Sequence, residues 1–330
     1  MEVILHSLTM PIWGKALWLW LTFGGIVIAL LFFDLGVLNR DDHIISIRES
    51  LLLSSGYIGV ALLYGAGVWW HLGEASGLAY VTGYLIEKSL SIDNVFVIAL
   101  IFSYLAIPLR YQHRVLFWGI VGVVVLRAAM IALGAALLHE FSWILYLFGA
   151  FLIVTGIKMW STVDARPDIA NNPMLRFLRR HIRCTPEASS HQFIVRRPHP
   201  QTGKSVLWAT PLLFALCMVE FADLVFAVDS VPAIFSITTD PFIVYTSNVF
   251  AILGLRALYF ALAALIHQFK YLKYALALVL VFIGSKIFLV GIVGKIPAVV
   301  SLTVTLGLIA GGMVVSLWQA RRKLSATNSG

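Results

Sequence analysis

Charged residues are scarce in this chain. Only 12% of its 330 residues are Asp, Glu, Lys or Arg, whereas 60% are hydrophobic and the mean hydropathy is +0.91. A soluble domain averages roughly 25% charged residues, so the composition excludes an ordinary soluble protein. The apolar residues gather in runs of about 20, the length that a helix needs to cross a bilayer. The composition therefore predicts a membrane protein with several spans.

Cysteine is also rare. The chain holds two, Cys184 in a polar loop and Cys217 in an apolar run, and neither their number nor their spacing indicates a disulfide framework or a zinc site. A GxxxxGK[ST] phosphate-binding loop is missing as well, so nothing in the chain points to ATP-driven transport. The first apolar run, at 16–38, is too long for the h-region of a signal peptide, and no A-x-A-like site follows it. We expect it to remain as a span.

Hydropathy predicts an all-α, polytopic bundle of about nine transmembrane helices. The connections between them alternate between basic ones and ones without Lys or Arg, with Lys295 before the last helix as the exception. The long polar segment 161–206 carries eight Lys or Arg against three acids, a net charge of +5 (8 − 3). Basic loops stay in the cytoplasm, so the N-terminus is predicted outside and the C-terminus inside. The nine predicted helices are 16–38, 51–70, 79–104, 114–138, 143–160, 207–236, 242–266, 273–293 and 298–319.

The two halves of the bundle resemble each other. "VVVLRAAMIAL" at 123–133 is echoed by "AILGLRALYFAL" at 251–262, and "LSIDNVFVIALIF" at 90–102 by "FAVDSVPAIFSIT" at 226–238. Each unit holds three helices. Because this number is odd, the second unit crosses the membrane in the opposite orientation to the first, as in many secondary transporters. The predicted organisation is two N-terminal helices (1–78), repeat 1 (79–160), a basic cytoplasmic linker (161–206), repeat 2 (207–294), and a last helix with a basic tail (295–330).

Acidic residues lie inside the predicted spans, where each costs roughly 2.5–3.5 kcal/mol on insertion scales. Such residues usually line an ion pathway or a substrate site. The alternative is that they form ion pairs that hold the bundle together. The acids are Asp34, Glu87, Asp93, Glu220, Asp223 and Asp229, and the basic residues that could pair with them are Lys88, Arg127, Lys158, Arg256 and Lys286.

The repeat pairs these acids. When Asp93 is superposed on Asp229, Glu87 falls on Asp223, because each lies six residues earlier. A small polar residue follows each second acid, Asn94 or Ser230. The symmetry of an inverted repeat predicts that both sets meet near the middle of the membrane, where such transporters bind their substrate.

Oxygen atoms dominate this predicted site. Carboxylates, the amide or hydroxyl of Asn94, Ser230 and Asn248, and backbone carbonyls suit hard cations such as Mg²⁺, Ca²⁺ or Mn²⁺. Asp34 is a further candidate ligand near a helix end. Pro232 lacks an N–H, so we expect a break in its helix that frees the carbonyl of Val228.

Four segments carry a resemblance to a known family: "FFDLGVLNR", "EKSLSIDNVFVIALIF", "FADLVFAVDSVPAIFSIT" and "SNVFAILGLRALYF". They resemble the TerC family, and the length and N-terminal extension are similar to those of its Alx-type members. The resemblance implies the LysE-type transporter superfamily, an inverted three-helix repeat, and Mn²⁺ efflux across the bacterial inner membrane. It places the family's motif acids on Glu87, Asp93, Glu220, Asp223 and Asp229.

The prediction is thus a secondary transporter that exports Mn²⁺, with proton exchange left open, rather than an enzyme. Its expected partners are the divalent metal ion and the lipid bilayer, without nucleic acid and without an organic cofactor. Two alternatives stay open: transport of Ca²⁺ or another divalent cation, and a membrane protein that supplies metal to exported enzymes.

Overall fold

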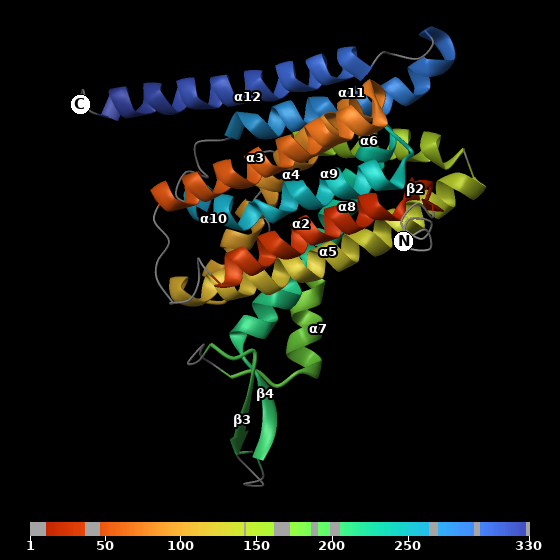
Figure 1. The fold of residues 1–330 in the computed structure, drawn as a ribbon. Helices are drawn as coiled ribbons and strands as arrows, with labels where there is room; N and C mark the ends of the chain where they lie inside the picture. Colours follow the sequence, from red (N-terminus) through yellow and green to blue (C-terminus); the bar gives the residue numbers. More distant parts are fainter. Residues whose placement is uncertain are drawn as a thin grey trace.

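The chain folds into a bundle of long helices that lie side by side (Figure 1). A computed structural model describes residues 11–36, 47–141, 143–161, 172–185, 191–198, 205–263, 270–293 and 298–327. The predicted fold class is confirmed: this is an all-α membrane helix bundle. Five helices in the described ranges are long and apolar enough to cross a membrane, namely Arg48–Leu72, Leu109–Glu140, Ile144–Ser161, Pro211–Phe235 and Val299–Ser316.

Most predicted helices are found within a few residues of their predicted ends. Two short antiparallel strands, β1 (Pro11–Ile12) and β2 (Lys15–Ala16), precede the first helix. The count of nine spans and the inverted repeat stay predictions. The helices of the bundle are α2 (Leu17–Gly36), α3 (Ile47–Leu72), α4 (Glu74–Tyr104), α5 (Leu109–Glu140), α6 (Ile144–Ser161), α8 (Pro211–Phe235), α9 (Pro241–Leu253), α10 (Leu255–Ala263), α11 (Lys270–Val293) and α12 (Ala298–Thr327).

The predicted helix 242–266 is wrong as a single element, because the chain breaks into α9 and α10 at Gly254. The ammonium group of Lys88 in α4 donates a hydrogen bond to the carbonyl of Ala251, 3.2 Å away, in the last turn of α9. A Cβ at Gly254 would lie 2.8 Å from that ammonium nitrogen, so a larger residue there would require the end of the Lys88 side chain to shift. A cation at a helix C-terminus is favourable because the helix dipole is negative there. Lys88 therefore supports the break.

The expected break at Pro232 is also wrong. Helix α8 continues through Pro232 and ends three residues later at Phe235. Proline removes one N–H from the helix ladder, but here it lies in the last turn, where few further bonds depend on it. The N–H of Ser236 donates to the carbonyl of Pro232 at 3.0 Å, which closes the helix end. The discontinuity in this half of the bundle thus lies in the next helix, at Gly254.

The predicted linker contains a folded unit. Helix α7 (Pro173–His181) is followed by a hairpin of β3 (Ile194–Pro198) and β4 (Ser205–Ala209), in antiparallel register with Ile194 opposite Ala209. Both extend away from the bundle (Figure 1). Repeat 2 was predicted to begin at 207, but β4 runs to Ala209 and α8 begins at Pro211. Hydropathy misplaced this boundary because the end of β4 is as apolar as the helix that follows.

Glycines let α6 and α11 approach closely. A Cβ at Gly156 would lie 2.7 Å from the carbonyl oxygen of Ala277, and one at Gly284 would lie 2.6 Å from that of Gly149. Both of these oxygens belong to the backbone, which cannot move aside as a flexible side chain can, so a side chain at either glycine would push the two helices apart. Small residues at helix interfaces allow this kind of packing in membranes.

We predict that Gly284→Ala destabilises the bundle by about 1–3 kcal/mol, the usual effect of overpacking a tight contact. The measurement is thermal melting of the purified protein in detergent. Gly307→Ala in α12 is the matched control, because a Cβ there would meet no atom within 4 Å. Equal melting temperatures for the two variants would contradict the close approach of α6 and α11.

The orientation of the bundle can be tested at Cys184, which lies between α7 and β3 and is half-buried. Burial raises the pKa of its thiol, and the nearby Arg179 lowers it in part. Because the thiolate is the reactive form, labelling should speed up as the pH rises, and it should need a higher pH than an exposed cysteine does. We predict that an impermeant maleimide labels Cys184 in inside-out vesicles but leaves it untouched on intact cells.

A Cys184→Ser variant measures the labelling that Cys217 contributes. Labelling of Cys184 on intact cells would place the linker outside and reverse the predicted topology.

Candidate cation site

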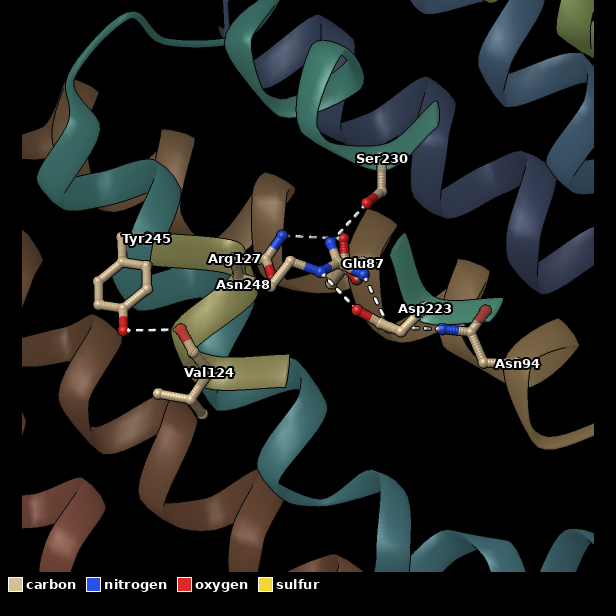
Figure 2. A network of polar contacts seen from close by, with 8 residues as sticks. All are labelled: Glu87, Asn94, Val124, Arg127, Asp223, Ser230, Tyr245 and Asn248. Atoms are coloured by element: carbon tan, nitrogen blue, oxygen red, sulfur yellow. Dashed lines mark hydrogen bonds and ion pairs between the residues drawn. The ribbon is translucent and has the colours of Figure 1, made fainter. Parts of the chain in front are cut away.

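An arginine lies at the centre of the bundle's main polar cluster. Arg127, near the middle of α5, is fully buried, with 0% of its side chain exposed. Its Nη2 lies 3.1 Å from Oε1 of Glu87 in α4, and its Nε lies 3.1 Å from Oδ2 of Asp223 in α8. Nη2 also donates to Oδ1 of Asp223 at 3.1 Å, so the second pair is bidentate. Figure 2 shows the guanidinium between the two carboxylates.

Three neutral side chains complete the cluster (Figure 2). Nη1 of Arg127 donates to the hydroxyl of Ser230 at 2.7 Å. The amide of Asn248 in α9 donates to Oε2 of Glu87 at 3.1 Å, and the amide of Asn94 donates to Oδ1 of Asp223 at 3.4 Å. Four helices, α4, α5, α8 and α9, therefore supply the polar groups of one buried site.

The charges of this cluster do not cancel. Glu87 and Asp223 carry two negative charges when ionised, and Arg127 carries one positive charge. Glu87 is 1% exposed and Asp223 is 6% exposed, so water screens them little. Buried charges are stable only when they are paired and hydrogen-bonded. The cluster can therefore accept additional positive charge.

Buried oxygen atoms near the cluster lack a hydrogen-bond partner within the part of the chain that the structure describes. They are Oδ1 of Asn94, Oδ1 of Asn248 and Oε2 of Glu220. Buried polar atoms are usually hydrogen-bonded, and each exception calls for a physical explanation. All three are oxygens, which are the ligands that hard cations prefer.

Glu220 lies one helical turn before Asp223 on α8. Its carboxylate lies directly over Gly122 of α5, where a Cβ would clash with both carboxylate oxygens. Gly119, one turn earlier, has more room, because its Cβ would lie 3.5 Å from Val219. Gly122 is thus the position on α5 that lets the Glu220 carboxylate approach.

A small cavity adjoins the cluster. Its volume is about 30 Å³, and Asn94 and Asp223 supply its polar lining among apolar side chains such as Ile98, Leu116 and Val219. Such a volume holds one or two water molecules. On α5 the lining residues precede Arg127, and on α4 they follow Glu87, so the cavity lies on the side of the cluster nearer the linker.

The structure brings together some of the predicted site residues and leaves others apart. It joins Glu87, Asn94, Asp223, Ser230 and Asn248 around Arg127, with Glu220 beside them. Lys158 is exposed on α6, and Lys286 is half-buried on α11. Within the described side chains, no three His, Cys, Asp or Glu residues are close enough to hold a metal ion together. The side chains of Asp34, Asp93, Asp229 and Arg256 lie outside the described ones.

Sequence reasoning missed the central position of Arg127. It expected an arginine that balances charge, whereas the guanidinium joins an acid from each predicted repeat. The signal was present, because Glu87 and Asp223 are the pair that the repeat superposes. The place of Gly122 under the Glu220 carboxylate could not be read from spacing along the chain.

Comparison with known proteins gives a consistent result. Residues 72–324 match the family described as "Integral membrane protein TerC family". An uncharacterized membrane protein of Myxococcus xanthus is 48% identical over 303 residues, covering 92% of this chain and 93% of its own. Alx of Salmonella typhi, for which a role as a membrane-bound redox modulator has been suggested, is 45% identical over 93% of this chain and 97% of its own.

Alx of Escherichia coli K12 is 44% identical over 91% of this chain and 94% of its own. No solved structure matches the chain significantly. The family match covers most of the chain, and the relatives align along nearly their whole length. This chain belongs to the TerC family of integral membrane proteins.

Proposed function

We propose that this protein is a secondary transporter that exports Mn²⁺ across the bacterial inner membrane. The observation that carries the proposal is the meeting of Glu87 and Asp223, from different helices, in a fully buried cluster with excess negative charge. Ionisable residues inside a membrane bundle mark ion pathways more often than structural pairs. The choice of Mn²⁺ rests on the resemblance to the TerC family. The oxygen ligands alone favour a hard divalent cation.

Cation entry is coupled to Arg127 in this proposal. Because the guanidinium pairs with both carboxylates, an incoming cation competes with it for their oxygens. The incoming ion would gain Oδ1 of Asn94 and Oδ1 of Asn248 as neutral ligands, since neither has a hydrogen-bond partner in the described chain. The cavity on the linker side gives space for the ion beside Asp223. Arg127 then limits the affinity of the site, which favours release on the other side.

The test is metal flux into proteoliposomes that contain the purified protein. We expect uptake of Mn²⁺, with weaker or no uptake of Mg²⁺, Ca²⁺ and Zn²⁺, and no uptake into liposomes without protein. A preference for Ca²⁺ would support the alternative substrate within the same class. If none of the four ions moves although the protein has inserted, the transporter proposal fails, and a role in supplying metal to exported enzymes becomes the better account.

The proposal also includes the exchange of protons for Mn²⁺. Carboxylates that bind a metal ion must be deprotonated, so Mn²⁺ and H⁺ compete for them. Apparent Mn²⁺ affinity should therefore rise with pH. Flux should also respond to a pH gradient across the liposome membrane if the displaced protons leave on the opposite side. Affinity that rises with pH without any effect of the gradient would keep the shared site but reject antiport.

A further inference from the structure

A basic pocket lies where the linker unit joins the bundle. Its wall includes Arg179, Arg180 and Arg183 from the end of α7 and beyond, Trp208 from β4, and Phe214 from the first turn of α8. We propose that this pocket binds the phosphate group of an anionic phospholipid. The pocket is separate from the candidate cation site, and the proposal does not depend on Mn²⁺ transport.

The first argument is charge. The described linker ranges 172–185 and 191–198, together with 205–219, hold six arginines and no Asp or Glu. Arg179, Arg180 and Arg183 are exposed, and none of them forms an ion pair within the described part of the chain. Arginine recognises phosphate well because its planar fork of N–H groups matches phosphate oxygens. The pocket thus collects cations that no described carboxylate neutralises.

The second argument is an unused donor. The indole Nε1 of Trp208 is buried and has no acceptor in the described residues. An indole nitrogen can only donate, and the arginine side chains of the pocket are donors as well, so they cannot satisfy it. A buried donor without a partner is unusual in a folded protein. A phosphate oxygen in the pocket would accept this hydrogen bond.

The pocket is held by backbone hydrogen bonds. The N–H of Ala209 donates to the carbonyl of Arg183 at 2.9 Å, and the N–H of Thr185 donates to the carbonyl of Ala209 at 2.9 Å. On the other side, Leu175 and Leu178 of α7 are buried in the core of the bundle. The arginines therefore project from a fixed frame, which reduces the entropy lost when an anion binds.

The position of the pocket favours a lipid over soluble phosphate. Phe214 lies in the first turn of α8, one of the helices that can span the membrane, so the pocket lies at a membrane end of that helix. Two large apolar side chains beside it are exposed, Phe177 at 56% and Ile182 at 37%. Basic pockets at the ends of membrane helices bind lipid headgroups, and neighbouring apolar side chains contact acyl chains.

The experiment is a calorimetric titration of the full-length protein in neutral detergent with dioctanoyl phosphatidylglycerol, dioctanoyl phosphatidylcholine or inorganic phosphate. We expect phosphatidylglycerol to bind best. The variant Arg179→Gln/Arg183→Gln should bind it about tenfold more weakly or worse, because each arginine near a lipid surface contributes attraction. The control Arg196→Gln/Arg197→Gln removes the same charge from β3, outside the pocket, and should have little effect.

Trp208→Phe tests the pocket without changing its charge, and it should weaken binding by severalfold. Equal weakening by the two arginine pairs would mean a diffuse basic surface and would overturn the pocket. Binding of inorganic phosphate as tight as that of phosphatidylglycerol would overturn the lipid as the source of the phosphate group. Unchanged affinity in Trp208→Phe would remove the indole donor from the proposed site.

Discussion

Replacing Arg127 with methionine should lower the stability of the bundle by about 3–5 kcal/mol, because it leaves buried carboxylates without their partner. Methionine keeps much of the side-chain length but removes every N–H that now contacts Glu87, Asp223 and Ser230. Thermal melting in detergent measures the loss. Addition of Mn²⁺ should restore part of it, since a bound cation stabilises the folded state by mass action. The wild type should gain less, because there Mn²⁺ competes with the guanidinium for the carboxylate oxygens.

The triple variant Arg127→Met/Glu87→Gln/Asp223→Asn is the matched control. It removes all three charges together, so no uncompensated buried charge remains. We expect it to melt closer to the wild type and to show no response to Mn²⁺. If the single variant melts like the wild type, Arg127 does not stabilise these carboxylates, and the pairing described above is wrong.

The sequence predicted the membrane bundle well because the physics of the bilayer leaves few options. Long apolar runs must become helices, since lipid cannot satisfy a free backbone. Predictions failed where tertiary contacts decide the outcome. Pro232 predicts a break in the helix, but it lies in the last turn of α8, so the helix ends before a break could form. Nothing in the sequence distinguishes Gly254 from the other glycines, but the ammonium group of Lys88 stabilises a helix end at that position.

The sequence predicted which residues form the candidate site better than it predicted how those residues are arranged. Charge inside an apolar span is a strong signal, and it pointed to Glu87, Asp223 and Glu220. Distances between helices cannot be read from spacing along one chain, so the central place of Arg127 and the fit of Glu220 against Gly122 needed the fold. Asp93 and Asp229 remain predictions from the repeat.

Asp223→Asn and Glu87→Gln should each lower Mn²⁺ flux by about two to three decades. Each substitution keeps the shape of the side chain and removes one negative charge from the buried site. Each variant leaves one carboxylate balanced by Arg127, so the cluster loses the excess negative charge that a divalent cation would neutralise. Two to three decades correspond to a loss of about 3–4 kcal/mol in binding, because every 1.4 kcal/mol is about a factor of ten. Flux per inserted protein in proteoliposomes is the measurement. Asp93→Asn and Asp229→Asn should have effects of similar size if the predicted repeat places them in the same site.

Glu140→Gln gives the control for charge. Glu140 ends α5 with 71% of its side chain exposed, far from the cluster along the helix, so flux should stay near that of the wild type. Asn94→Ala tests a neutral ligand and should cost less than either acid, about tenfold, because an amide oxygen contributes no net charge. Full flux in Asp223→Asn would remove this carboxylate from the pathway. Together with an unchanged Arg127→Met, it would favour a purely structural cluster and move the search for the site to Asp93 and Asp229.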